Sequence, residues 1–214
     1  MRKVRIAILI VFLSTLAASL YFYAQLPEMM PSHWNAEGDV DSYMPKAWGA
    51  FLVPFLIAAI ACLLLFIPET DPMKQNVDRF RNYYDGFVIL LAVFMAGVHF
   101  QLILWALGVE ISPNNTFPIG IGIMFFYIGI LLEKSRRNWF IGIRTPWTMS
   151  SDRVWEKTHK LGGILFKIAG LVSLTGVFFP AYSVLLILIS AILAAVFCVI
   201  YSYFEYQKEK SMRR

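Results

Sequence analysis

Residues Ser183–Phe204 read SVLLILISAILAAVFCVIYSYF, a run that contains no charged side chain. A bilayer core about 30 Å thick requires about 20 apolar residues in a helix, so this stretch predicts a membrane span. Five further apolar runs predict spans in the rest of the chain: Ile6–Ala24, Ala47–Ile67, Gly86–Gly108, Phe117–Leu132 and Gly162–Phe179. We therefore expect an all-α integral membrane protein that folds as a bundle of six transmembrane helices.

The composition of the chain supports the same fold class. Hydrophobic residues make up 58% of the 214 positions and charged residues only 15%, whereas a soluble domain carries about 25% charged residues. The first run begins with basic residues, as a secretory signal does, but we expect it to stay as a span because its removal would leave an odd number of spans. These observations exclude an ordinary soluble domain.

The predicted fourth span, Phe117–Leu132, is the shortest. At 1.5 Å per residue it reaches about 24 Å, less than the thickness of the bilayer core. We therefore expect it to extend into the preceding residues Asn114, Asn115 and Thr116, to lie in a thinned bilayer, or to be enclosed by its neighbours.

The distribution of basic residues predicts the orientation. All but two of the 19 Lys and Arg lie at the N-terminus, in the second and fourth connections, or in the C-terminal tail; the exceptions are Lys46 and Lys167. Since Lys and Arg in short loops stay on the cytoplasmic side, both termini are predicted to be cytoplasmic. Membrane lipids are then the expected partners of this positive charge, and direct nucleic-acid binding is not expected.

The chain divides into three regions. Residues 1–67 form an N-terminal two-helix region with an extracytoplasmic loop over 25–46. Residues 68–132 hold the third and fourth helices, and residues 133–214 hold a cytoplasmic loop over 133–161 and the last two helices. Small residues recur every four positions in the last span, at Ser190, Ala194, Cys198 and Ser202. This stripe predicts that the last two spans pack as a hairpin.

Few polar side chains lie within the predicted spans. His99 and Gln101 lie in the third, and we expect His99 to hydrogen-bond to a neighbouring helix. Lys167 lies close enough to the inner end of the fifth span to reach the interface by snorkelling. A path through the bundle past His99 and Gln101 is the alternative, and it would make the protein a small transporter or lipid-handling protein.

The cytoplasmic loop contains the run NWFIGIRTPWT over residues 138–148. Pro146 prevents a continuous helix, and Ser151 followed by Asp152 predicts the N-cap of a short helix that reaches about Lys160. One interpretation anchors the loop at the membrane interface through Trp139, Phe140, Trp147 and Trp155, with Arg136, Arg137 and Arg144 on lipid phosphates. The other makes Arg144, Trp147, Trp155 and His159 a docking site. Physical chemistry alone favours anchoring.

The outer loop over residues 25–46 is acidic, with Glu28, Glu37, Asp39 and Asp41 against a single Lys. Such a surface attracts a cationic peptide. The spacing of His33 and the acids matches neither a zinc signature nor a calcium loop, so we predict no metal site and no cofactor. Trp34 and Tyr43 are consistent with a purely structural cap, but the interpretation that we prefer is a ligand-recognising cap.

Signatures of catalysis are missing from the sequence. It contains no His-Glu-x-x-His, no Gly-x-Ser-x-Gly and no phosphate-binding glycine loop. Glu156 and His159 have the Glu-x-x-His spacing of di-iron bundles, but those sites need two copies. We therefore do not expect an enzyme.

Both loops resemble known families. The run NWFxGIRTPWT, followed by Trp155-x-x-Thr158-His159-x-x-Gly162, resembles the signature of the SdpI family of bacteriocin immunity proteins. Leu26-Pro27, Pro31-x-His33-Trp34-Asn35-x-x-Gly38 and Tyr43-x-x-Lys46 resemble the short N-terminal domain of unknown function that often precedes the SdpI region.

This resemblance implies a non-enzymatic, multi-pass protein of the plasma membrane. It implies protection against a secreted membrane-active toxic peptide and signalling by recruitment of a cytoplasmic transcriptional repressor. The outer loop would then recognise the peptide through His33, Trp34, Asn35, Tyr43 and Lys46. The inner loop would face the repressor through Asn138, Gly142, Arg144, Thr145, Pro146, Trp147, Trp155 and His159.

Overall fold

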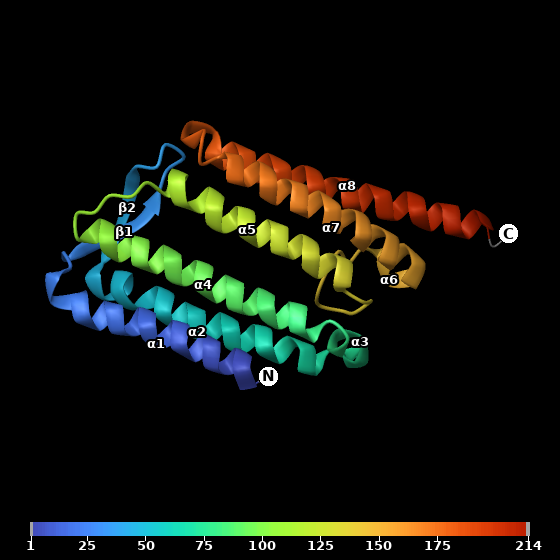
Figure 1. Ribbon diagram of the computed structural model, residues 1–214, viewed down its shortest axis with the longest axis horizontal. Helices are drawn as coiled ribbons and strands as arrows, with labels where there is room; N and C mark the ends of the chain where they lie inside the picture. The colour runs from blue at the N-terminus through green and yellow to red at the C-terminus, as the bar shows by residue number, and fades with distance from the viewer. Residues whose placement is uncertain (1, 213–214) are drawn as a thin grey trace.

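The computed structural model describes residues 2–212, which form six long helices that run roughly parallel and antiparallel to one another (Figure 1). The long helices are α1 (Arg2–Phe22), α2 (Lys46–Thr70), α4 (Arg81–Ala106), α5 (Pro113–Lys134), α7 (Asp152–Thr175) and α8 (Ser183–Met212). The short elements are η1 (Tyr23–Gln25), β1 (Met29–Trp34), β2 (Val40–Pro45), α3 (Lys74–Asp78), α6 (Pro146–Ser150) and η2 (Pro180–Tyr182).

Five helical segments within residues 2–212 are long and apolar enough to cross a membrane: α1 with η1, α2, α4, α5, and α8 with η2. This confirms the all-α membrane class, to which the structure adds the small β1–β2 sheet. The sixth long helix, α7, is too polar to be counted with them because its first turns carry Asp152, Arg153, Glu156, Lys157 and Lys160. Six spans and cytoplasmic termini therefore remain predictions.

Helix α7 differs from its prediction in one respect. The sequence predicts a short helix that ends near Lys160 and a separate span that starts at Gly162, whereas the structure joins the two into one helix. The predicted N-cap is confirmed, because the Val154 amide donates to Ser151 Oγ at 3.3 Å. No proline interrupts the helix between the two segments.

Helix α5 resolves the question of the short fourth span. It extends at both ends of the predicted run and includes Asn114, Asn115 and Thr116, as the first of the three expectations required. Ser112 caps it, since the Asn114 amide donates to Ser112 Oγ at 3.3 Å. The whole helix spans about 33 Å at 1.5 Å per residue.

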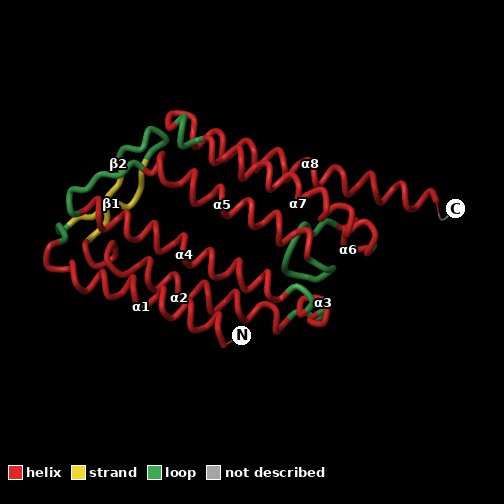
Figure 2. Tube along the Cα trace, in the orientation of Figure 1, coloured by secondary structure: helices red, strands yellow, loops and turns green. Residues whose placement is uncertain are grey.

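The six long helices form two groups of three, α1 with α2 and α4, and α5 with α7 and α8, as Figure 2 shows. We call the interface between α4 and α5, where the two groups meet, the seam. The closest pair of helices is α5 and α7, whose glycines face one another. A Cβ added to Gly170 would lie 2.5 Å from the Gly122 carbonyl oxygen, and one added to Gly129 would lie 2.5 Å from the Gly163 carbonyl oxygen.

Small residues also join α7 to α8, as predicted. Ala194, Cys198 and Ser202 are buried, and a Cβ on Gly162 would lie 3.2 Å from Cys198 Sγ. The Nζ atom of Lys167, which we expected to reach the interface by snorkelling, pairs with Glu133 Oε1 on α5 at 2.7 Å. The ion pair therefore joins the same two helices as the glycines.

The polar residues of α4 bond within the fold. His99 Nε2 lies 2.9 Å from Ser19 Oγ on α1, and Ser19 donates to the Ala50 carbonyl on α2. This confirms the expected structural role of His99. Gln101 donates to the Ile111 carbonyl at 2.8 Å and accepts from the Thr116 hydroxyl at 2.7 Å.

Candidate functional site

The outer loop folds as a β-hairpin at one end of the bundle (Figure 1). Asn35 closes its turn by accepting from the Asp39 amide at 2.8 Å, and Gly38 adopts a φ of 91° that favours glycine. The tip of the hairpin rests on the start of α5, where Asn114 Nδ2 donates to the Ala36 carbonyl at 2.9 Å. The hairpin is thus fixed to the second group of helices.

The five predicted outer residues do not form one pocket. Trp34 packs edge-on against Trp105 on α4, with ring centroids 5.6 Å apart. Lys46 lies at the base of the hairpin, its Nζ atom 4.9 Å from the centre of the Tyr23 ring. Together with Asn35 in the turn, these residues hold the hairpin in place.

His33 and Tyr43 are the members of the predicted outer set that face solvent. His33 Nδ1 lies 2.6 Å from Asp41 Oδ1 on the neighbouring strand. Within residues 2–212 no three His, Cys, Asp or Glu side chains converge on a point where a metal ion could bind. The exposed face of the hairpin therefore offers an aromatic ring and an acidic surface.

The inner loop is built around Asn138, whose side chain is fully buried. Its Nδ2 atom donates to the carbonyls of Arg136 and Ile141, both at 2.8 Å. Its Oδ1 atom accepts from the amides of Phe140 at 3.0 Å and Ile141 at 2.6 Å. A single side chain therefore satisfies four backbone groups of a loop that has no regular secondary structure.

His159 fixes the next part of the loop. Its ring stacks on Trp155 with centroids 3.9 Å apart. Its Nδ1 atom lies 2.8 Å from the Trp155 carbonyl, and its Nε2 atom accepts from the Ile143 amide at 2.9 Å. This arrangement requires a neutral ring with the proton on Nδ1.

Gly142 is required beside this ring. It adopts a φ of 116°, and a Cβ at this position would lie 2.4 Å from His159 Nε2. Any other residue would therefore be strained and would also push the ring away from the Ile143 amide.

The rest of the predicted inner set attaches the loop to α8. Thr145 caps α6 by accepting from the Thr148 amide at 3.1 Å, and its hydroxyl lies 3.0 Å from Ser202 Oγ. Pro146 occupies the first turn of α6. Trp147 packs edge-on against Tyr203, with ring centroids 5.1 Å apart.

The exposed side chains of the inner loop include Trp139, Phe140 and Arg144. The Arg144 guanidinium donates to the Trp139 carbonyl, which ties the Arg144 side chain to the backbone at Trp139. Trp155 is only 2% exposed, so the expectation that it anchors the loop in lipid is wrong. Buried Trp155 and His159 can support a partner site but cannot touch the partner.

Two residues of the connection between α2 and α4 bond to the inner loop and were not predicted from the sequence. Asp71 Oδ2 accepts from the Trp139 amide at 2.9 Å, and Asn76 Nδ2 donates to the Arg137 carbonyl at 2.8 Å. No signal in the sequence separates Asp71 from nearby Asp78, because the contact joins segments that are far apart in the chain.

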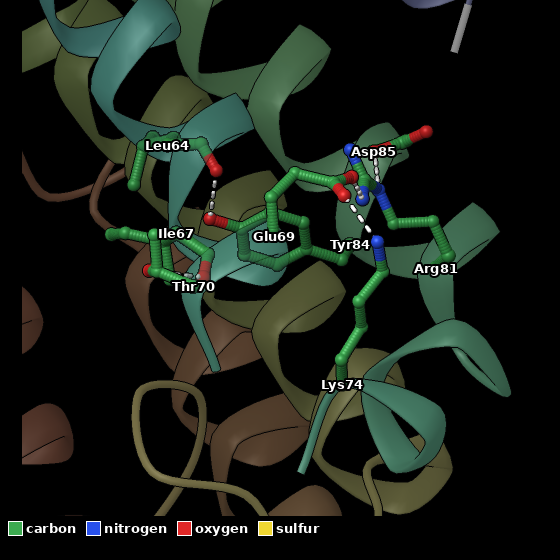
Figure 3. A network of polar contacts seen from close by, with 8 residues as sticks. All are labelled: Leu64, Ile67, Glu69, Thr70, Lys74, Arg81, Tyr84 and Asp85. Atoms are coloured by element: carbon green, nitrogen blue, oxygen red, sulfur yellow. Dashed lines mark hydrogen bonds and ion pairs between the residues drawn. The ribbon is translucent and has the colours of Figure 1, made fainter. Parts of the chain in front are cut away.

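A charge network positions that connection, as Figure 3 shows. The Glu69 carboxylate accepts from Lys74 Nζ at 2.5 Å and from Arg81 at 3.0 Å, and Arg81 Nε also pairs with Asp85 at 2.7 Å. The network ties the end of α2 to α3 and to the start of α4. Asp71, which lies between them, is thereby held against the inner loop.

Lowering the pH is expected to loosen the inner loop. Burial lowers the pKa of His159 to about 4 from an ordinary value of 6.5, although its hydrogen bond to Trp155 raises it slightly. The unfolded loop therefore binds more protons between these values, so its stability is complete above pH 6.5 and falls as the pH drops towards 4. Below pH 4 the stability of the inner loop is lower than at neutral pH by about 3 kcal/mol. Hydrogen exchange at the Ile143 amide, corrected for intrinsic rates, measures it.

The control for this experiment is His159→Phe, which removes the titrating group. Exchange at Ile143 should then be faster at pH 7 and should no longer accelerate on acidification. An equal acceleration in both proteins would show that another group is responsible.

Comparison with known proteins relates both loops to families. Residues 134–202 match the SdpI/YfhL protein family, and residues 10–58 match a domain of unknown function, DUF1648. Over an alignment of 216 residues that covers 100% of both proteins, the chain is 27% identical to the Immunity protein SdpI of Bacillus subtilis (strain 168). No solved structure matches the chain. These matches confirm the resemblance predicted from the two loop motifs.

Proposed function

We propose that this chain, which carries a DUF1648 domain followed by an SdpI/YfhL family domain, is a membrane immunity protein. It protects its host against a secreted membrane-active toxic peptide. The observation that carries the proposal is the similarity to a protein named for immunity over the whole length of both chains. The apolar helices support an integral protein of the plasma membrane, and the distribution of Lys and Arg supports six spans with cytoplasmic termini.

The β-hairpin is the part that recognises the peptide in this proposal. Glu28, Glu37, Asp39 and Asp41 are all exposed on it and attract a cationic peptide. Tyr43, which is 57% exposed, offers an aromatic ring for apolar side chains. The peptide therefore meets charge and aromatic surface on the same small sheet.

The inner loop is the part that faces the cytoplasm, and we propose that it also signals by recruiting a cytoplasmic transcriptional repressor. Its buried residues fix the backbone, while Trp139, Phe140 and Arg144 remain exposed. An exposed aromatic pair beside an Arg has the composition that protein interfaces favour.

The proposal is for a non-enzymatic protein, and transport or lipid handling is its main competitor. His99 and Gln101, which motivated a path through the bundle, both bond to groups of the fold itself. Purified protein in proteoliposomes decides between the two. Flux of ions or of a small solute above that of empty vesicles would favour transport over immunity.

Survival of a toxin-sensitive host tests immunity directly. Cells that express the protein are challenged with a membrane-depolarising peptide. Tyr43→Ala and Arg144→Ala should each lower survival towards that of cells without the protein, by about tenfold or more, because both remove exposed contacts without opening the core. Arg153→Ala, another exposed Arg near the cytoplasmic end, should protect like the wild type at equal membrane abundance. Full protection by both test variants would contradict the proposed sites.

A further inference from the structure

A pocket lies at the inner end of the seam, between the two groups of three helices. Its volume is about 390 Å³, and its walls include Leu64, Tyr84, Ile128, Leu132, Ile143 and Phe166 from α2, α4, α5, α7 and the inner loop. This volume falls within the range of about 300 to 1,000 Å³ that is typical of small-ligand sites. The pocket therefore has room for part of a lipid-sized molecule.

The walls of this pocket offer almost no free hydrogen-bonding group. Tyr84 donates its hydroxyl proton to the Leu64 carbonyl at 2.7 Å, as Figure 3 shows, and Ser135 donates to the Leu132 carbonyl at 2.9 Å. The neighbouring cations Lys74 and Arg81 are paired with the carboxylates of Glu69 and Asp85, two charges of each sign. An occupant of the pocket must therefore be apolar where it meets these walls.

Three exposed cations, which we call the rim, are sequence neighbours of residues that line the pocket. Ser135 lies between Lys134 and Arg136 in the chain, and Arg144 follows Ile143, so three exposed cations adjoin residues that line the pocket. None of the three forms an ion pair within the described residues 2–212. In contrast, Lys74, Arg81, Arg137, Lys157 and Lys167 each pair with an acid. No acid among the described residues pairs with the rim, although the Lys134 Nζ atom lies 5.7 Å from the centre of the Tyr83 ring and Arg144 donates to the Trp139 carbonyl.

We propose that the pocket binds an anionic phospholipid, with one acyl chain between the helices and its phosphate held by Lys134, Arg136 and Arg144. An apolar cavity whose lining residues have cations without an acid partner as their sequence neighbours is complementary to such a molecule. Basic pockets between helices on the cytoplasmic side favour anionic headgroups. The same cations repel a cationic peptide. The lipid contacts Phe140, Ile141 and Ile143, so it stabilises the inner loop independently of any toxin.

Native mass spectrometry tests this with the full chain in detergent, mixed with equal amounts of phosphatidylglycerol and phosphatidylcholine that carry the same acyl chains. The wild type should retain phosphatidylglycerol in preference to phosphatidylcholine by about tenfold. The double variant Lys134→Gln with Arg136→Gln should lose this preference. The control Lys208→Gln with Lys210→Gln removes the same charge from the exposed end of α8 and should keep it. Equal loss in both double variants would overturn the site.

A second variant tests the cavity instead of the charge. Ile128→Trp fills the pocket from α5 without changing the charge of the rim, so it should reduce the retention of both lipids. Unchanged retention would overturn the proposal. A change from dimer to monomer with no change in bound lipid would also overturn it, because a second copy of the chain would then be the occupant.

Discussion

Gly170→Ala is expected to destabilise the protein, although alanine favours helix formation more than glycine by about 1 kcal/mol. The new Cβ would lie 2.5 Å from the Gly122 carbonyl and 2.7 Å from the Phe126 amide nitrogen. Both are backbone atoms, which cannot rotate away, so α5 and α7 must separate. Overpacking of this kind costs about 1–3 kcal/mol, and the melting temperature of the purified protein should fall by about 5 °C.

Gly97→Ala is the matched control in α4. A Cβ at Gly97 has no atom within 4 Å, so this variant keeps the gain in helix propensity and adds no clash. Its melting temperature should be equal to or above that of the wild type. If the two variants behave alike, close contact between the α5 and α7 backbones does not contribute to stability.

Asn138→Ala is expected to release the inner loop while the helices stay folded. The change removes hydrogen bonds to four backbone groups, two carbonyls and two amides. A buried group left without its partner costs about 1–3 kcal/mol, so a loss of more than 3 kcal/mol of local stability is expected. Hydrogen exchange of residues 136–145 should accelerate by at least about a hundredfold, and protection in the survival assay should fall with it.

Asn115→Ala is the control for this second variant, because Asn115 is exposed in the first turn of α5. Its effect should be within about 0.5 kcal/mol, which is usual for an exposed position. Slow exchange of the inner loop in Asn138→Ala would mean that the other contacts of the loop suffice to hold it.

Much of the fold could be predicted from the sequence because membrane spans depend on local hydrophobicity. Each predicted span coincides with most of a long helix, and the α7–α8 hairpin followed from the spacing of small residues in α8. The start of α7 also followed from a local signal, the N-cap at Ser151. The continuity of α7 did not, since its polar first turns and its apolar second half suggest two elements.

Contacts between distant segments escaped prediction. Gly122 and Gly129 in α5 are seven residues apart, as are Gly163 and Gly170 in α7, but this spacing does not show that the two helices face one another. In the two loops, the motifs identified residues that hold the loop structure. Several of those that we expected to contact a partner are buried instead. Trp155 and His159 are buried beneath the loop. The exposure of such a side chain depends on contacts with distant segments, so the motif alone does not predict it.

Helix α5 connects the two loops mechanically. Its first turn carries Asn114, which bonds to the hairpin tip, and its C-cap, Ser135, accepts from the indole nitrogen of Trp155 at 3.4 Å beneath the inner loop. A helix is stiff along its axis, and α5 packs closely against the glycines of α7. We therefore expect a displacement of the hairpin tip along the axis of α5 to reach the ring pair that supports the inner loop about 33 Å away.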